Sequence, residues 1–170
     1  MNVALLPSFG SGLTELAATG QASRLIDGYL RPYLAAFHEL HYFTYYPESL
    51  ADFTTDADLL ARVHVLAPRR RRHRLHRAIA IPFVHAGPYR ACAVARVFHT
   101  TGGIPAMIGL ARFGVPYVTT YGFRYSQLSG GNWPGRNHLK AWLKRATLRR
   151  AAAVIATTED LRAEAQALAP

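Results

Sequence analysis

The stretch AVARVFHTTGGIPAMIGLARFGVPYVTTYG, residues 93–122, decides the fold class of this 170-residue chain. It opens with an apolar run at 93–98, which is typical of a buried strand, and a polar, glycine-containing loop follows. Residues 104–113 carry apolar side chains at helical spacing, and 117–121 is a second apolar run. Strand, helix and strand in this order predict two parallel strands joined by a crossover helix.

The same alternation continues on both sides of this unit. Four further apolar runs predict strands, at residues 3–6, 40–46, 63–67 and 154–157. All of these runs are continuous rather than alternating, as a sheet covered on both faces requires. We therefore expect one α/β domain over residues 1–170, with a Rossmann-like, doubly wound, mainly parallel sheet and helices on both faces.

The helices between these strands are marked by periodicity and by caps. A stripe of apolar residues predicts a helix at about 21–37, which Pro32 kinks or divides. Gly114 should cap the helix at 104–113, and a basic helix is expected at about 137–151. Thr158 is a predicted N-cap of the last helix.

The charge is strongly uneven. The formal net charge is +10, and residues 59–158 contain seventeen arginines and lysines but no acidic residue. The segment therefore excludes a paired-carboxylate hydrolase and disfavours a magnesium or calcium site. An anionic partner is favoured, namely a phosphate, a nucleic acid or an acidic lipid.

The densest cationic run is RRRRHRLHR at residues 69–77, which we predict as a loop, as we do residues 130–135. We expect the cations of this run and of the basic helix to face an anionic membrane. A solvated face of an ordinary sheet-covering helix is the alternative. The residues of this predicted surface are Arg69, Arg70, Arg71, Arg72, Lys140, Lys144 and Arg145.

Cysteine and histidine usage does not indicate a disulfide or a metal site. Cys92 is the one cysteine, so we interpret it as a small core residue. Two histidine pairs, at 38 and 41 and at 73 and 76, are spaced three apart, but neither has a third histidine or a cysteine nearby in the sequence. We therefore expect no metal.

No segment indicates membrane insertion or export. No apolar run approaches the roughly 20 residues of a membrane span, and the N-terminus lacks a basic signal-peptide start. The expected location is cytoplasmic, with a peripheral position on the inner face of the cell membrane as a further expectation.

Ligands of doubly wound sheets bind beyond the carboxyl ends of the strands, and three loops follow such ends here. Gly10-Ser11-Gly12 resembles the start of a dinucleotide fingerprint, but Glu15 stands where the third glycine would be and no acid ends the second strand. NAD binding is therefore disfavoured. Close approach of a substrate to the backbone and a plain tight turn both remain open for this loop.

The other two loops carry polar groups of different kinds. His99-Thr100-Thr101-Gly102-Gly103 leads into a helix, whose N–H groups could hold an anion, although a capped helix with a satisfied histidine is an equal alternative. In Tyr121-Gly122-Phe123-Arg124-Tyr125 a guanidinium lies between phenols, an arrangement suited to a sugar or phosphate. Aromatic packing is the alternative for this loop.

Three stretches together resemble the N-terminal domain of family 4 glycosyltransferases of the GT-B fold. The first is Gly12 followed by Thr19-Gly20 and Arg24, and the second runs from residue 96 through 106 to 113–122. The third is AAVIATTEDL at 152–161. The resemblance covers nearly the whole chain and rests on the order and spacing of the stretches.

The resemblance implies a two-domain enzyme. In GT-B enzymes the N-terminal domain binds the acceptor, and the C-terminal domain binds the nucleotide-sugar donor and carries a Glu-x7-Glu pair. This chain has no such pair and stops at Pro170, where the family crosses into the second domain. We therefore expect no cofactor here, a donor-binding domain in the same or a separate chain, and no activity of this half alone.

The resemblance also implies residue roles in a retaining, metal-independent transfer of a hexosyl group to a glycan or lipid-linked hydroxyl, as in polysaccharide synthesis. His99 should face the reacting sugar, and so should Tyr121, which stands where many family members have a histidine. The expected acceptor-binding residues are Gly10, Ser11, Gly12, Thr19, Gly20, Arg24, Thr100, Gly102, Gly103, Gly122, Arg124 and Tyr125.

Two other functions remain open. One is a non-catalytic binding domain for an anionic glycan or a membrane lipid. The other is a basic nucleic-acid-binding protein, which is disfavoured because no motif with interleaved aromatic residues is present.

Overall fold

The computed structural model describes residues 1–70, 73–122 and 134–169. These residues form a six-stranded sheet in the order β3-β2-β1-β4-β5-β6, and every neighbouring pair of strands is parallel. The predicted Rossmann-like, doubly wound fold is confirmed. The strands are β1 (Asn2–Leu6), β2 (Glu39–Phe43), β3 (Val63–Leu66), β4 (Cys92–Val97), β5 (Tyr117–Tyr121) and β6 (Ala153–Ala156).

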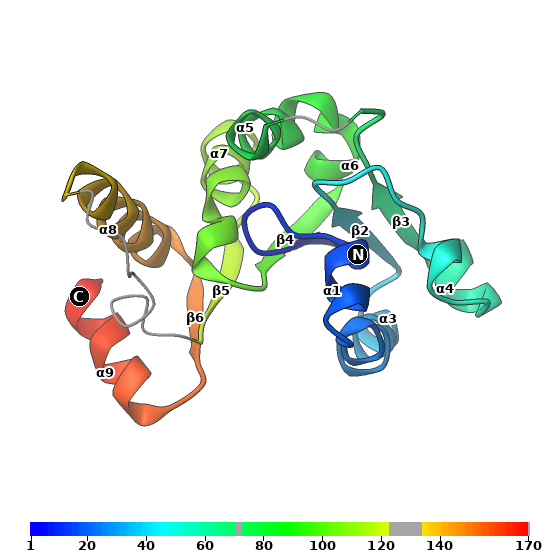
Figure 1. Cartoon of the computed structure of the whole chain (residues 1–170), viewed down its shortest axis with the longest axis horizontal. Helices are drawn as coiled ribbons and strands as arrows, with labels where there is room; N and C mark the ends of the chain where they lie inside the picture. The colour runs from blue at the N-terminus through cyan, green and yellow to red at the C-terminus, as the bar shows by residue number, and fades with distance from the viewer. Residues whose placement is uncertain (71–72, 123–133, 170) are drawn as a thin grey trace.

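The helices lie in two layers because the chain winds outward from β1 in one direction and from β4 in the other. The first layer holds α1 (Leu13–Ala18), α2 (Ala22–Leu25), α3 (Arg31–Ala36) and α4 (Ala57–Arg62). The second holds α5 (Arg74–Val84), α6 (Ala86–Arg90), α7 (Gly103–Phe113) and α8 (Pro134–Arg150). Figure 1 shows α4 at the β3 end of the sheet and α8 with α9 (Glu159–Leu168) at the β6 end.

Consecutive side chains of β1 pack into two different hydrophobic cores, one on each face of the sheet. Leu6 packs with Ile81 of α5 and Ala106 of α7, whereas Leu5 packs with Leu30 and Leu40 on the opposite face. Both leucines are fully buried. This two-sided burial is the physical reason for the unbroken apolar runs in the sequence.

The predicted helix at about 21–37 forms with a widened turn instead of a break. Between α2 and α3 lies the π-helical turn η1 (Ile26–Leu30), in which the N–H of Arg31 bonds to the carbonyl of Ile26, five residues back. Pro32 follows directly, in the first turn of α3. Proline clashes with the carbonyl four residues earlier in a regular helix, and the wider turn lies at that point.

Two of the predicted loops are partly helical. The run at 69–77 was expected to be a loop, but α5 begins at Arg74, and Arg77 is buried beside Ala78 and Ile81 on the core side of that helix. The apolar face of α5 begins within this arginine-rich run, and the arginines mask its helical periodicity in the sequence. The predicted loop 130–135 lies outside the described residues up to 133, and its last two residues open α8. Helices α1, α4, α5 and α6 have no counterpart among the sequence predictions.

The predicted caps are confirmed. Gly114 ends α7 in the left-handed conformation, with φ of 72°. The Thr158 side chain accepts a hydrogen bond from the N–H of Leu161 at the start of α9. These two signals are local, and the structure places both where the sequence does.

Candidate functional site

The strand order reverses between β1 and β4, so the loops after these strands run to opposite faces of the sheet. Such a switch point leaves a crevice beyond the carboxyl ends of the strands, where ligands of this fold class bind. Phe98 N–H donates to the Leu6 carbonyl at 2.9 Å and extends the pairing of the two strands up to this edge. The two predicted loops therefore start side by side.

Contacts between the two loops lock them together. The N–H of Phe9 donates to the Thr101 hydroxyl at 3.3 Å. A Cβ on Gly102 would lie 2.3 Å from the carbonyl oxygen of Pro7, so only glycine fits there. Gly103 is held as closely by Thr147 of α8, because its Cβ would lie 2.2 Å from the Thr147 hydroxyl oxygen. These two glycines serve the packing of the loop.

His99 is a buried side chain at the rim of this crevice. It is 7% exposed, and its Nδ1 accepts from the N–H of Thr101 at 3.4 Å, capping the short helix η3 (Thr100–Gly102). Because Nδ1 accepts, Nε2 carries the ring proton. Burial lowers the pKa of His99 below its ordinary value, so the ring is neutral at pH 7.

A carboxylate that sequence reasoning missed lies at the start of α1. Glu48 accepts from the N–H groups of Leu13 and Thr14 at 2.7 and 2.9 Å, and from the Thr14 hydroxyl at 2.8 Å. Thr44 also donates its hydroxyl to Glu48. The N-terminal end of α1, where the helix dipole favours negative charge, is therefore already occupied by the Glu48 carboxylate. A Cβ on Gly12 would lie 2.4 Å from the same carboxylate, which explains this glycine.

Gly10 and Ser11 form the turn before α1. Gly10 has a φ of +79°, and Arg74 of α5 packs over it so closely that a Cβ would lie 2.4 Å from its Cδ. The N–H of Ser11 donates to the carbonyl of Ser8 at 2.9 Å. The loop after β1 thus also contacts the start of α5, which follows β3.

Thr19 and Gly20 lie on the exposed turn between α1 and α2, and Arg24 is exposed in α2. The Thr19 hydroxyl donates to the carbonyls of Glu15 and Leu16 in its own helix, and Gly20 has a φ of +69°. Among the described residues, the hydrogen bonds do not link this turn to the loops after β1 and β4. Their acceptor role stays a prediction.

Tyr121 is fully buried at the end of β5. Its hydroxyl donates to the Glu164 carboxylate of α9 at 2.5 Å and accepts from the Lys144 ammonium of α8 at 3.2 Å. Lys144 also bonds to Glu164 at 3.3 Å. The group joins β5, α8 and α9, and the predicted role of Tyr121 at a sugar stays a prediction. Gly122 follows, partly exposed, and Arg124 and Tyr125 lie outside the described residues.

Arg96, at the carboxyl end of β4, is a buried cation that the sequence reasoning did not assign to the site. Its guanidinium donates to the Tyr33 hydroxyl at 3.0 Å, to the Thr120 hydroxyl at 2.6 Å and to the carbonyl of Val97 at 3.0 Å, and it lies over the Phe98 ring. Among the described residues, no carboxylate pairs with it. The sequence alone does not show that β4 lies between β1 and β5, so it does not reveal which side chains surround Arg96.

The predicted cationic surface is only partly assembled. Arg69, Arg70, Lys140 and Arg145 are exposed, whereas Lys144 is engaged with Glu164. Arg71 and Arg72 lie outside the described residues. No helix within the described part of the chain is long and apolar enough to cross a bilayer.

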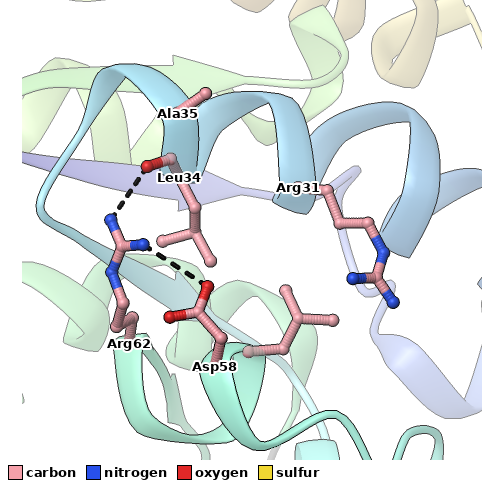
Figure 2. Close-up of a pocket in the computed structure, with 6 residues that line it drawn as sticks. Arg31, Leu34, Ala35, Asp58 and Arg62 are labelled. Atoms are coloured by element: carbon pink, nitrogen blue, oxygen red, sulfur yellow. Dashed lines mark hydrogen bonds and ion pairs between the residues drawn. The ribbon is translucent and has the colours of Figure 1, made fainter.

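A pocket lies elsewhere, between α3 and α4 (Figure 2). Arg62 donates there to the carbonyl of Leu34 and to the Asp58 carboxylate, while Arg31 lines the other side of the pocket and pairs with Asp27 and Asp56. Both helices end where β2 and β3 begin, so the pocket is at the amino edge of the sheet. It is not part of the predicted site.

Comparisons with known proteins agree with this architecture. The chain matches sucrose-phosphate synthase from Thermosynechococcus elongatus with a TM-score of 0.62 at 15% identity. The match covers 98% of this chain and 45% of that one, so the chain spans about half of its length. No curated protein matches by sequence.

The fold is therefore that of one half of a GT-B enzyme, as the resemblance implied. Residues 15–170 match the glycosyl transferase 4-like domain family. The matched range contains the turn at Gly20 and the loops that follow β4 and β5. The family match covers far more than half of this chain. The chain belongs to the glycosyl transferase 4-like domain family.

Proposed function

We propose that the chain is the acceptor-binding half of an enzyme that moves a hexosyl group from a nucleotide-diphosphate sugar to a hydroxyl with retention of configuration. Family membership and the match to about half of a larger enzyme support this proposal. A donor-binding domain, in the same or a separate chain, would form the other wall of the cleft.

The observation that carries the proposal is the locked pair of loops after β1 and β4 at the switch point of the sheet. Transfer between two bound substrates depends on holding the acceptor oxygen in line with the sugar carbon. Loops joined by Phe9 and Thr101, and by Gly102 against Pro7, form a rigid wall suited to that task.

His99 has the properties needed beside a reacting sugar. A neutral imidazole with a proton on Nε2 is a hydrogen-bond donor that does not repel the positive charge that develops on the sugar. In this proposal Arg124 and Tyr125 orient the acceptor, and Tyr121 contributes through its hydroxyl, which joins Lys144 and Glu164. The negative charge on the leaving phosphate belongs to the donor-binding side.

Reconstitution tests the assignment. The chain is mixed with a separately produced donor-binding domain of the same family, and transfer of labelled sugar to a panel of hydroxyl acceptors is measured. We expect His99→Ala and Arg124→Ala each to lower the rate by roughly tenfold or more, because each removes a positioning group.

Arg112→Ala is the matched control, because Arg112 is an exposed arginine near the end of α7, far along the helix from the loop. It should leave the rate unchanged. Thermal unfolding of each variant separates a lost contact from a lost fold. Rates within a factor of two of wild type for both His99→Ala and Arg124→Ala contradict the site assignment.

A membrane-facing surface is a second element of the proposal, supported by apolar side chains that the basic-residue pattern did not indicate. Leu75, Ile79 and Phe83 are spaced four apart on α5 and are 45%, 46% and 55% exposed. Trp142 of α8 is 61% exposed beside Lys140 and Arg145. Both helices pack against α7, so both belong to the same layer of the fold.

Vesicle sedimentation tests this surface. We expect binding to anionic vesicles, weaker binding to neutral ones, and a several-fold loss in the double variant Ile79→Ser/Phe83→Ser. Leu60→Ser is the control, since Leu60 is 40% exposed on α4, in the other layer. Vesicle binding without transfer in the reconstituted pair would favour a non-catalytic lipid- or glycan-binding domain. Steeply salt-dependent binding to random duplex DNA alone would favour a nucleic-acid-binding protein.

A further inference from the structure

Three potential metal ligands meet at the amino edge of the sheet, away from the loops of the proposed site. Glu39 and His41 are two residues apart on β2, so their side chains leave the same face of the strand. His64 on β3 is the register partner of His41. Neighbouring parallel strands therefore place the two imidazoles side by side, with ring centroids 5.4 Å apart.

The distances between the three groups leave room for an ion. The Nε2 atoms of His41 and His64 each lie 3.7 Å from a carboxylate oxygen of Glu39, and the three ligand atoms all lie within 4.8 Å of one another. These separations exceed ordinary hydrogen bonds. Tetrahedral zinc with bonds of about 2.0–2.2 Å sets its ligand atoms roughly 3.3–3.6 Å apart, so side-chain movements of up to about an ångström would bring all three ligand atoms to that spacing.

Hydrogen bonds from neighbouring groups orient two of the ligands, His41 and Glu39, for metal binding. His41 Nδ1 lies 2.9 Å from the carbonyl of Pro88, and because a carbonyl only accepts, Nδ1 carries the proton and Nε2 presents its lone pair toward Glu39. The Asn2 amide donates to Glu39 at 3.1 Å. Carbonyl-held imidazoles and hydrogen-bonded carboxylates are the usual supports of metal ligands.

Within the part of the chain that the structure describes, these three residues form the ligand set. Cys92 Sγ lies 3.5 Å from His41 Nδ1, on the opposite side of the ring from Glu39. The Cys92 Sγ also lies 3.2 Å from the Pro88 carbonyl, so it belongs to the support of His41 and not to the group around Glu39. His38 is 76% exposed and its Nδ1 lies 3.9 Å from Glu39, at the margin of the cluster.

The charge balance favours a soft divalent cation over calcium or magnesium. Two imidazole ligands stand beside one carboxylate here, and imidazole suits zinc, copper and nickel better than calcium or magnesium. His41 is 8% exposed and His64 is 43% exposed, so the cluster has an inner ligand and a solvent-facing ligand through which an ion can enter. A water molecule would take the remaining position.

We propose that Glu39, His41 and His64 form a binding site for a divalent transition metal of the zinc type, which joins β2 to β3 and, through Asn2, to β1. Its place at the amino edge makes it a structural or regulatory site for the sheet, independent of sugar transfer at the carboxyl edge. The spacing of histidines in the sequence does not reveal it, because His41 and His64 are brought together only by strand pairing.

Metal titration of the full, tag-free chain tests this proposal. Calorimetry with Zn²⁺ should show one ion per chain, Co²⁺ should develop the visible absorption of a tetrahedral site, and added Zn²⁺ should raise the Tm by mass action. His64→Ala should weaken binding at least tenfold and abolish the rise in Tm. His64 is partly exposed, so this variant should keep the fold, and Glu39→Gln should weaken Zn²⁺ binding as well.

His38→Ala is the matched control, because this histidine is adjacent in space and sequence but outside the cluster. It should bind Zn²⁺ as the wild type does. Absence of stoichiometric binding, equal binding by wild type and His64→Ala, or equal losses in His38→Ala and His64→Ala would each overturn the proposal.

Discussion

The two edges of the sheet are stabilised in different ways. At the carboxyl edge, buried side chains bond to loops far away in the sequence: Arg77 donates to the carbonyls of Thr44 and Leu66, and Glu48 closes the start of α1. At the amino edge, β3 begins directly after α4, and an exposed arginine, Arg31, pairs with Asp27 and Asp56.

The difference follows from what each edge must do. Short connections at the amino edge leave few backbone groups to satisfy, and one half-buried side chain, Arg62, bonds to the carbonyls of Leu34, Phe37 and His38 there. The longer loops at the carboxyl edge must hold one shape beside a ligand, and internal polar groups provide that shape. Disrupting the carboxyl edge should therefore cost more than disrupting the amino edge, and the following predictions test that ranking.

The largest effect is expected for Arg77→Ala. Arg77 is 3% exposed, and its removal leaves the carbonyls of Thr44 and Leu66 without these donors and a cavity beneath α5. We expect a loss of about 3 kcal/mol or more of unfolding free energy by urea denaturation. The exposed Arg69→Ala is the control and should stay within about 0.5 kcal/mol. Equal effects of the two variants would contradict a role of Arg77 in this edge.

The next effect is expected for Gly102→Ala. The added methyl would lie 2.3 Å from the Pro7 carbonyl, and two backbone segments must separate to admit it. We expect a loss of about 2–3 kcal/mol in denaturant unfolding. Gly20→Ala meets no neighbour but keeps a φ of +69°, so it should cost only about 1 kcal/mol. A smaller loss for Gly102→Ala than for Gly20→Ala would refute the close packing of the two loops.

Glu48→Gln should have a moderate effect. The change keeps the shape of the side chain but replaces a charged acceptor of the Leu13 and Thr14 N–H groups with a neutral one. We expect a loss of about 1–2 kcal/mol, measured by thermal and denaturant unfolding. Glu15→Gln is the matched control, because Glu15 is exposed in the first turn of the same helix. The ranking fails if Glu15→Gln costs as much.

The pH dependence of stability should report on His85 at the same edge. Burial, with a smaller contribution from Arg77, lowers the pKa of His85 to about 4. The unfolded chain therefore binds a proton first, and stability should fall as the pH is lowered from about 6.5 toward 4. Tm values measured across this range should fall less steeply in His85→Gln. The exposed variant His73→Gln should follow the wild type, and an unchanged slope in His85→Gln would contradict this assignment.

The smallest effect is expected at the amino edge, for Arg31→Ala. The Arg31 side chain is half exposed, and its pairs with Asp27 and Asp56 are open to solvent and to salt. The Tm should change less than in any variant above, and the small difference should shrink further in high salt. A loss as large as that of Arg77→Ala would remove the contrast between the two edges.

The sequence predicts the strands better than the loops. All six apolar runs overlap β1–β6. In β1 and β2 nearly every side chain is buried on one face or the other, which leaves no polar alternation, whereas Val154 and Ile155 of β6 are exposed. The start of α5 was missed because its first turns carry arginines, and Arg77 among them points into the core. Its burial depends on carbonyls at residues 44 and 66, which no local pattern connects to it.

The candidate site was predicted in outline, since loops after parallel strands meet at one edge. The sequence places Gly10–Gly12 and His99–Gly103 there, and Phe9 and Thr101 do join these loops. It does not indicate that Glu48 would close α1, that Arg96 would meet Thr120, or that Tyr121 would be enclosed by Lys144 and Glu164. Each of these contacts joins residues brought together by strand order or helix packing.

The sequence by itself determined the class of the fold, the family and the local caps, because apolar periodicity and motif order are properties of neighbouring residues. Only the tertiary structure decided which polar groups face one another. His41 and His64 show the reason: they are 23 positions apart in the chain, and the register of β2 against β3 alone makes them neighbours.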